Sequence, residues 1–108
     1  MKILPYRAVT STGDTFDIEF PLHHDTQDAV RVSQLLSEIL LSIDRGLAFS
    51  GATSNGDVLQ AVAMAIAIRA RMIHAPVDVS GRLATDLLSV ALAAVASATR
   101  QAPVTGHA

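Results

Sequence analysis

Cysteine and tryptophan are absent from this chain, and aromatic residues make up only 4% of its 108 residues. Without cysteine there is no disulfide framework, no zinc site built on thiolates and no thiol nucleophile. Charged residues are also few, at 17%, and they give a formal net charge of -2. Because the eight lysine and arginine residues are spread along the chain, they form no basic stripe that would neutralise phosphates. Nucleic acid is therefore not an expected partner.

Long hydrophobic runs and an export signal are also lacking. The longest unbroken apolar run, residues 61–68, has eight residues, whereas about 18 to 20 are needed to cross a bilayer. The first nine residues include Pro5 and Arg7 and contain no apolar segment of the kind found in signal peptides. We therefore expect a cytoplasmic protein that does not contact a membrane.

Half of the residues are hydrophobic. This composition excludes intrinsic disorder, because disordered chains combine low hydrophobicity with high net charge. Globular domains cluster at about 100 to 150 residues, so the length fits one domain. We expect a single domain over residues 1–108 that buries about two thirds of its surface on folding.

Two strands are predicted at the N-terminus, over residues 2–10 and 14–22. In the second strand apolar and charged residues alternate with a period of two, as in a strand with one buried face. Between the strands, Gly13 lies where a three-residue loop needs a residue in the left-handed conformation. The pattern therefore predicts an antiparallel hairpin.

The hydrophobic pattern and the turn agree on one register for this hairpin. Arg7 faces Asp17 on the solvated side. The pairs expected on the buried side, against the first helix, are Leu4 with Phe20, Tyr6 with Ile18, and Ala8 with Phe16. Pro5 and Pro21 cannot donate backbone hydrogen bonds, which is typical of edge strands.

Three helices are predicted after the hairpin, over residues 27–49, 57–74 and 80–101. The first has apolar residues spaced by three and four, which is typical of an amphipathic helix. The second is apolar around its whole circumference over residues 61–68, and the third is nearly so over 90–96, which is typical of helices buried on all sides. The expected fold class is α+β in the order ββααα, with a three-helix region over 26–101 and a flexible tail over 102–108.

The densest group of side chains that bind metals lies in the connector before the first helix. A metal site there would use His23, His24 and Asp28, since imidazole and carboxylate suit zinc, iron or manganese. However, adjacent residues point to different sides of an extended segment, and the spacing matches no HExxH-type motif. We therefore favour a solvated loop over a metal site and expect no cofactor. Asp25 or Thr26 then serves as the N-cap of the helix.

Motifs for nucleotide binding and nucleophilic catalysis are incomplete. Residues 51–56 have the glycine spacing of a phosphate loop, but Asp57 and Val58 stand where that loop has Lys and then Ser or Thr. The sequence has no GxSxG elbow. The hairpin carboxylates are expected on a solvated face, which does not favour an acid–base pair. Catalytic residues are therefore not assigned.

Small residues follow the second and third helices at helical spacing. Such side chains let helix axes approach closely, either within one chain or between two chains. Three helices and a two-stranded ribbon do not easily cover two helices that are apolar all round, so a second copy is expected to cover them. The residues expected at this interface are Ala63, Ile66, Ala67, Ala70, Ala91, Ala94 and Ala98.

These patterns favour a non-enzymatic accessory protein that forms a homo-oligomer, most simply a homodimer, through its alanine-rich helices. An unknown protein partner would use the same surfaces. The first alternative is a small-molecule binder with an apolar pocket between hairpin and helices, and with Arg69 or Arg71 at the mouth for an acidic group. The second alternative is a small metal-dependent enzyme that uses His23 and His24.

Overall fold

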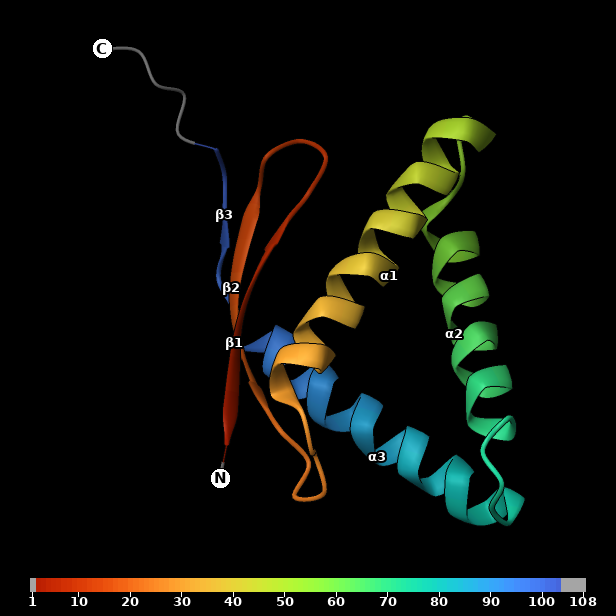
Figure 1. The fold of residues 1–108 in the computed structure, drawn as a ribbon. Helices are drawn as coiled ribbons and strands as arrows, with labels where there is room; N and C mark the ends of the chain where they lie inside the picture. Colours follow the sequence, from red (N-terminus) through yellow and green to blue (C-terminus); the bar gives the residue numbers. More distant parts are fainter. Residues whose placement is uncertain (1, 104–108) are drawn as a thin grey trace. The chain divides into compact units, whose positions relative to one another are not determined.

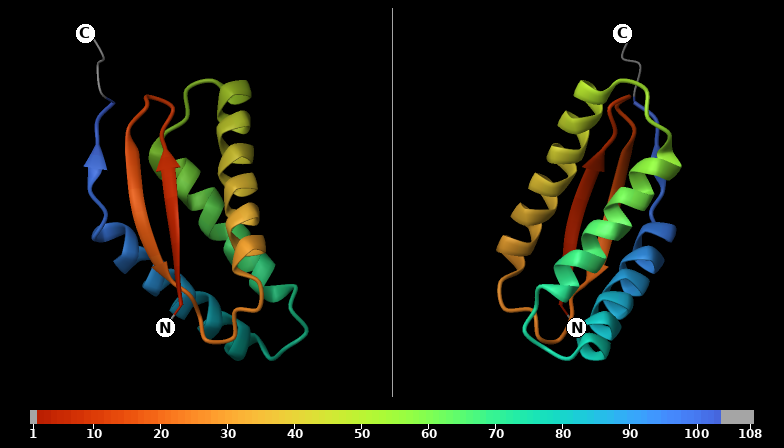
Figure 2. Two further views of the ribbon diagram at one scale, coloured as in Figure 1. Left: turned by 60° about the vertical axis from the view of Figure 1, so that its left-hand side comes forward. Right: turned by 90° about the vertical axis from the view of Figure 1, so that its right-hand side faces the viewer.

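A computed structural model of the chain describes residues 2–103 (Figures 1 and 2). The elements are β1 (Ile3–Val9), β2 (Thr15–Pro21), α1 (Ala29–Ser50), α2 (Asn55–Arg71), α3 (Val77–Ala96) and β3 (Arg100–Gln101). This is the predicted α+β fold of a hairpin followed by three helices, with a short third strand added. Two compact units make up the chain: unit 1 takes residues 1–39 and 90–108, and unit 2 takes residues 40–89. The single domain expected from the chain length stays a prediction.

The hairpin of unit 1 has the predicted register. The strands are antiparallel with Arg7 opposite Asp17, and the three expected core pairs, Leu4 with Phe20, Tyr6 with Ile18 and Ala8 with Phe16, are present. The side chains of β1 alternate between exposed and half-buried, and Ile18 in β2 is buried, with 7% of its surface exposed. The Tyr6 hydroxyl forms a 2.9 Å hydrogen bond with the Ser37 hydroxyl of α1. The less exposed face of the hairpin therefore carries the predicted core and contacts the first helix.

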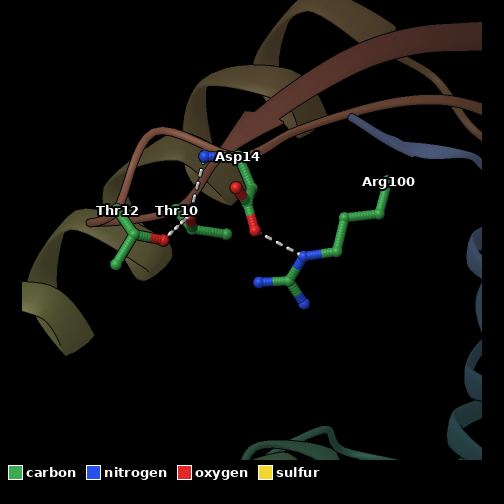
Figure 3. A network of polar contacts seen from close by, with 4 residues as sticks. All are labelled: Thr10, Thr12, Asp14 and Arg100. Carbon is green, nitrogen blue, oxygen red and sulfur yellow. Dashed lines mark hydrogen bonds and ion pairs between the residues drawn. The ribbon is translucent and has the colours of Figure 1, made fainter. Parts of the chain in front are cut away.

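The turn of the hairpin is closed by backbone and side-chain hydrogen bonds, of which Figure 3 shows those made by the Thr10 hydroxyl. Gly13 has a φ of 89°, the left-handed conformation that the loop requires. The Thr10 N–H donates to the Asp14 carbonyl at 2.9 Å, and the Asp14 N–H donates to the Thr10 hydroxyl at 3.1 Å. The register is thus set locally by the residues of the turn.

Pro5 lies where its missing N–H leaves the hairpin ladder intact. The Leu22 N–H donates to the Lys2 carbonyl, and the Thr10 N–H to the Asp14 carbonyl. Even-numbered residues of β1 therefore direct their backbone groups toward β2, and odd-numbered residues direct theirs away from it. Since β1 is an edge of the sheet, whose order is β1-β2-β3, Pro5 removes a donor from the outer edge. A proline there weakens this edge as a template for another strand.

The third helix ends earlier than predicted, at Ala96, and the chain then forms β3 along the start of β2. The prediction that this helix continues to residue 101 is wrong. Arg100 donates from Nε to the Asp14 carboxylate at 2.7 Å, and its guanidinium carbon lies 5.3 Å from the centre of the Phe16 ring. These partners are about 85 residues away in sequence, so a helical propensity pattern contains no signal for them. Of the predicted tail, residues 104–108 lie outside the described residues.

The N-cap of the first helix also differs from the prediction. The helix begins at Ala29, and the Asp28 carboxylate accepts a 3.0 Å hydrogen bond from the Arg31 N–H. Asp28 is therefore the N-cap, and the assignment of Asp25 or Thr26 to that position is wrong. Thr26 instead closes a turn, because its N–H donates to the His23 carbonyl at 2.9 Å.

The helices contain almost no buried residues. Within the described chain, α1 and α2 have none and α3 has only Ser80, which is 5% exposed. The expectation that the apolar segments of α2 and α3 are buried on all sides is therefore not met inside one chain. The hydroxyl of Ser80 lies 3.4 Å from the Pro76 carbonyl, so this buried polar group has a hydrogen-bond partner.

We predict that Asp14→Asn loosens β3 from the sheet, because the ion pair with Arg100 is lost. An exposed pair of this kind contributes about 0.2–1 kcal/mol. We therefore expect amide hydrogen exchange of the β3 residues to become about two- to fivefold faster. Asp17→Asn is the matched control, since it removes a carboxylate that pairs with Arg7 instead. Equal acceleration in both variants would contradict the assignment.

Candidate functional site

A groove of about 800 Å³ lies within unit 1, between the hairpin and the C-terminal part of α3. We call it the hairpin groove. Its hairpin wall is made of Pro5, Tyr6, Arg7, Asp17, Ile18, Glu19 and Pro21. Its helix wall is made of Val90, Ala93, Ala94, Ser97 and Ala98. One wall is therefore largely polar and the other consists of small and apolar side chains.

An ion pair dominates the polar wall of the hairpin groove. Arg7 donates to the Asp17 carboxylate from Nε at 2.7 Å and from Nη2 at 3.1 Å. The hydrogen bond from Arg7 lowers the pKa of Asp17, and the same bond raises the pKa of Arg7. Both side chains are exposed, so solvent screens the pair. With Glu19 beside them, these charges sum to about -1, and this wall does not favour an acidic ligand.

A smaller groove of about 350 Å³ lies within unit 2, between α2 and the first part of α3. We call it the alanine groove. Four of the residues predicted for an oligomer interface line it from α2, namely Ala63, Ile66, Ala67 and Ala70. The facing residues of α3 include Gly81 and Ala84. The small residues of α2 thus face α3 of the same chain along this groove, while Ala94 and Ala98 line the hairpin groove.

The arginines that the sequence placed at a pocket mouth belong to unit 2. Arg71 lines the alanine groove. Arg69 contacts the C-cap of its own helix, with 3.6 Å between its Nη1 and the sulfur of Met72. Their role in holding an acidic ligand stays a prediction.

A second face of α2 carries an exposed stripe that the sequence analysis missed. The α2 stripe consists of Asp57, Ala61, Met64, Ile68 and Arg71, spaced by four, three, four and three residues. Met64 and Ile68 are each 57% exposed, and the other three are exposed as well. This spacing is the heptad pattern of helices that pair with another helix. The sequence does not reveal this stripe, because residues 61–68 are apolar around the whole helix circumference and no single face stands out. The opposite charges of Asp57 and Arg71 at its two ends could have indicated it.

The structure brings His23, His24 and Asp25 together. The potential ligand atoms of these residues all lie within 4.8 Å of one another. The expectation that adjacent residues point apart is therefore wrong, because this segment is a turn and not an extended strand. Asp28, which the predicted metal site included, serves as the helix N-cap instead.

The geometry of this cluster does not favour one bound metal ion. The two imidazole rings are stacked, with centroids 4.2 Å apart and planes inclined by 29°. The lone pairs of imidazole lie in the ring plane, so stacked rings do not direct them at a common point. His23 Nδ1 also accepts a 3.1 Å hydrogen bond from the Asp25 N–H. His24 and Asp25 are largely exposed, at 82% and 78%.

Among the described residues, α3 is the one helix whose length and composition would let it cross a membrane. It has 20 residues. Its most apolar 18-residue segment has a mean hydropathy of 1.5, and 6% of that segment is buried. The criterion of an unbroken apolar run overlooked it, because Arg82 and Asp86 interrupt the run without lowering the average much. Each such charge costs about 2.5–3.5 kcal/mol at the centre of a bilayer.

We predict that the purified chain carries no stoichiometric zinc, iron or manganese, because its clustered ligands are stacked and solvated. Elemental analysis of the purified protein measures this directly. Near-stoichiometric metal that disappears in His24→Ala, but persists in the control Asp28→Asn, would contradict the prediction and support the metal-dependent alternative.

Comparisons with protein-family models, with curated proteins and with solved structures found no match to this chain. The function is therefore inferred from the two grooves, the α2 stripe and the exposed helix surfaces described above.

Proposed function

We propose that this chain is a non-enzymatic accessory protein that works as a homo-oligomer, most simply a homodimer, assembled through its apolar helices. The observation that supports this proposal is that residues 2–103 form almost no buried hydrophobic core. Half of the residues are hydrophobic, yet among the described residues only Ile18 is both hydrophobic and buried. A chain of this kind needs other protein surface to fold stably.

The exposed hydrophobic residues are large and lie on all three helices. Phe49 of α1 is 96% exposed, Leu59 of α2 is 71% exposed and Leu92 of α3 is 57% exposed. Full burial of one such side chain contributes about 1.5–3 kcal/mol. Conformational entropy costs a 100-residue chain of the order of 100 kcal/mol, and hydrophobic burial is the main term that offsets it. Association of chains supplies the burial that one chain lacks.

A second copy of the chain is the partner we favour. Obligate homodimer interfaces are apolar and resemble a core cut in half, which matches these helix surfaces. Closed two-fold symmetry is also the commonest form of assembly. The net charge of -2 opposes self-association only weakly. Because Pro5 weakens the outer edge of β1, we place the contact on the helices and not on paired hairpins.

We expect the purified protein to be an oligomer whose dissociation and unfolding coincide. Light scattering should give a mass that is a multiple of 11.3 kDa at micromolar concentration, and the midpoint of thermal unfolding should rise with protein concentration. A folded particle of 11.3 kDa at high micromolar concentration, with a concentration-independent midpoint, would contradict the proposal.

A small-molecule binding protein is the second candidate, and the hairpin groove is the observation that favours it. Its volume of about 800 Å³ falls within the range of about 300–1,000 Å³ that is common for ligand pockets. An apolar helix wall and a polar hairpin wall together suit a ligand with one apolar face.

Ala94→Phe tests this second candidate, because the larger side chain fills the hairpin groove from its helix wall. If a ligand is bound there, native mass spectrometry of the purified protein should show a co-purified mass that Ala94→Phe loses. Leu92→Phe is the matched control on α3, since Leu92 does not line the groove. A wild-type protein without any co-purified mass, or a mass kept by Ala94→Phe, would count against this candidate.

A further inference from the structure

We infer that α2 pairs in antiparallel orientation with α2 of a second copy, through the α2 stripe. This inference rests on the proposed homo-oligomer and specifies which surface joins the two chains. The stripe combines an exposed apolar centre, Met64 and Ile68, with a carboxylate at one end and a guanidinium at the other.

The charges at the two ends determine the orientation of the pair. Asp57 lies in the first turn of α2 and Arg71 in the last turn. If a two-fold axis passes at Met64, antiparallel helices place Asp57 opposite Arg71 of the second copy, at both ends of the seam. A parallel pair would instead place like charges opposite each other. Electrostatic complementarity therefore selects the antiparallel arrangement.

The two charged groups cannot satisfy each other within one helix. They are separated by 14 residues, which corresponds to about 21 Å along a helix axis. No ion pair found among residues 2–103 involves either of them. Each charge also suits its own helix end, since a carboxylate is favourable at the N-terminus and a cation at the C-terminus. An antiparallel partner adds a favourable contact without disturbing these local interactions.

The contact between the two α2 stripes forms the centre of the interface and not all of it. A stable interface buries about 800 Å² per partner, which is more than a seam of about 21 Å between two helices provides. Met72, at 61% exposed, lies directly after α2 and extends its apolar surface. Other exposed hydrophobic residues of unit 2, with Phe49 as the most exposed, supply further area.

Charge reversal in the full-length chain tests the pairing. Asp57→Arg and Arg71→Asp each replace two attractive contacts per dimer by two repulsive ones. Because exposed contacts change sign at both ends of the interface, each single variant should raise the dimer dissociation constant about tenfold. The double variant should return to within about threefold of wild type, because its charges are complementary again. Arg69→Asp is the matched control: it makes the same charge change in the last turn but off the stripe, so it should have little effect.

Mixing the two single variants provides a second readout, made once circular dichroism shows that both variants keep the helix content of the wild type. The Asp57→Arg chain and the Arg71→Asp chain should form a heterodimer more tightly than either forms a homodimer. If the wild type is a dimer but the double variant is as weak as the single ones and mixing brings no gain, the α2 pairing is overturned while the proposed oligomer stands. If the wild type is a folded monomer, both fail.

The lack of cysteine allows a second test that does not depend on charge. Met64 faces itself across the two-fold axis, so Met64→Cys should form an intermolecular disulfide under mild oxidation. Leu59→Cys is the control, since Leu59 is also exposed but lies off the α2 stripe. Equal crosslinking of both variants, or crosslinking of Leu59→Cys alone, would overturn the pairing.

Discussion

Burial of hydrophobic surface is the constraint on which the rest of this structure depends. The chain is half hydrophobic, but its described helices bury no hydrophobic residue within one copy. Hydrogen bonds and ion pairs in unit 1 fix the hairpin and β3, yet exposed pairs of this type contribute about 1 kcal/mol or less. They cannot replace a core. The proposed association of chains would cover this surface and supply the large stabilising term.

The hairpin was predictable because the information for it is local. The alternation in β2 assigns a buried face, and Gly13 fixes the loop, so the register follows from a few neighbouring residues. The third strand was not predictable for the opposite reason. Arg100 is held by Asp14 and Phe16, which lie at the other end of the sequence. Local helix propensity favoured a continued helix there, and contacts between distant residues overrode it.

The candidate sites show the same division between local and distant information. The spacing of small residues on α2 predicted an interface between chains, but it did not reveal that α3 of the same chain faces Ala63 and Ala67 across a groove. His23 and His24 were expected to point apart because the connector was taken as extended, and a turn brings their rings together. The α2 stripe was overlooked because an all-apolar segment has no preferred face in a periodicity analysis.

Pro5 has a consequence at the time when the chain has just been made. At that time the apolar helices are uncovered and the outer strand of the sheet faces solvent, which is the condition under which proteins join strand to strand into fibrils. The proline ring removes one hydrogen-bond donor from the middle of this edge while the hairpin itself keeps all of its bonds. The addition of further strands at this edge is thereby disfavoured.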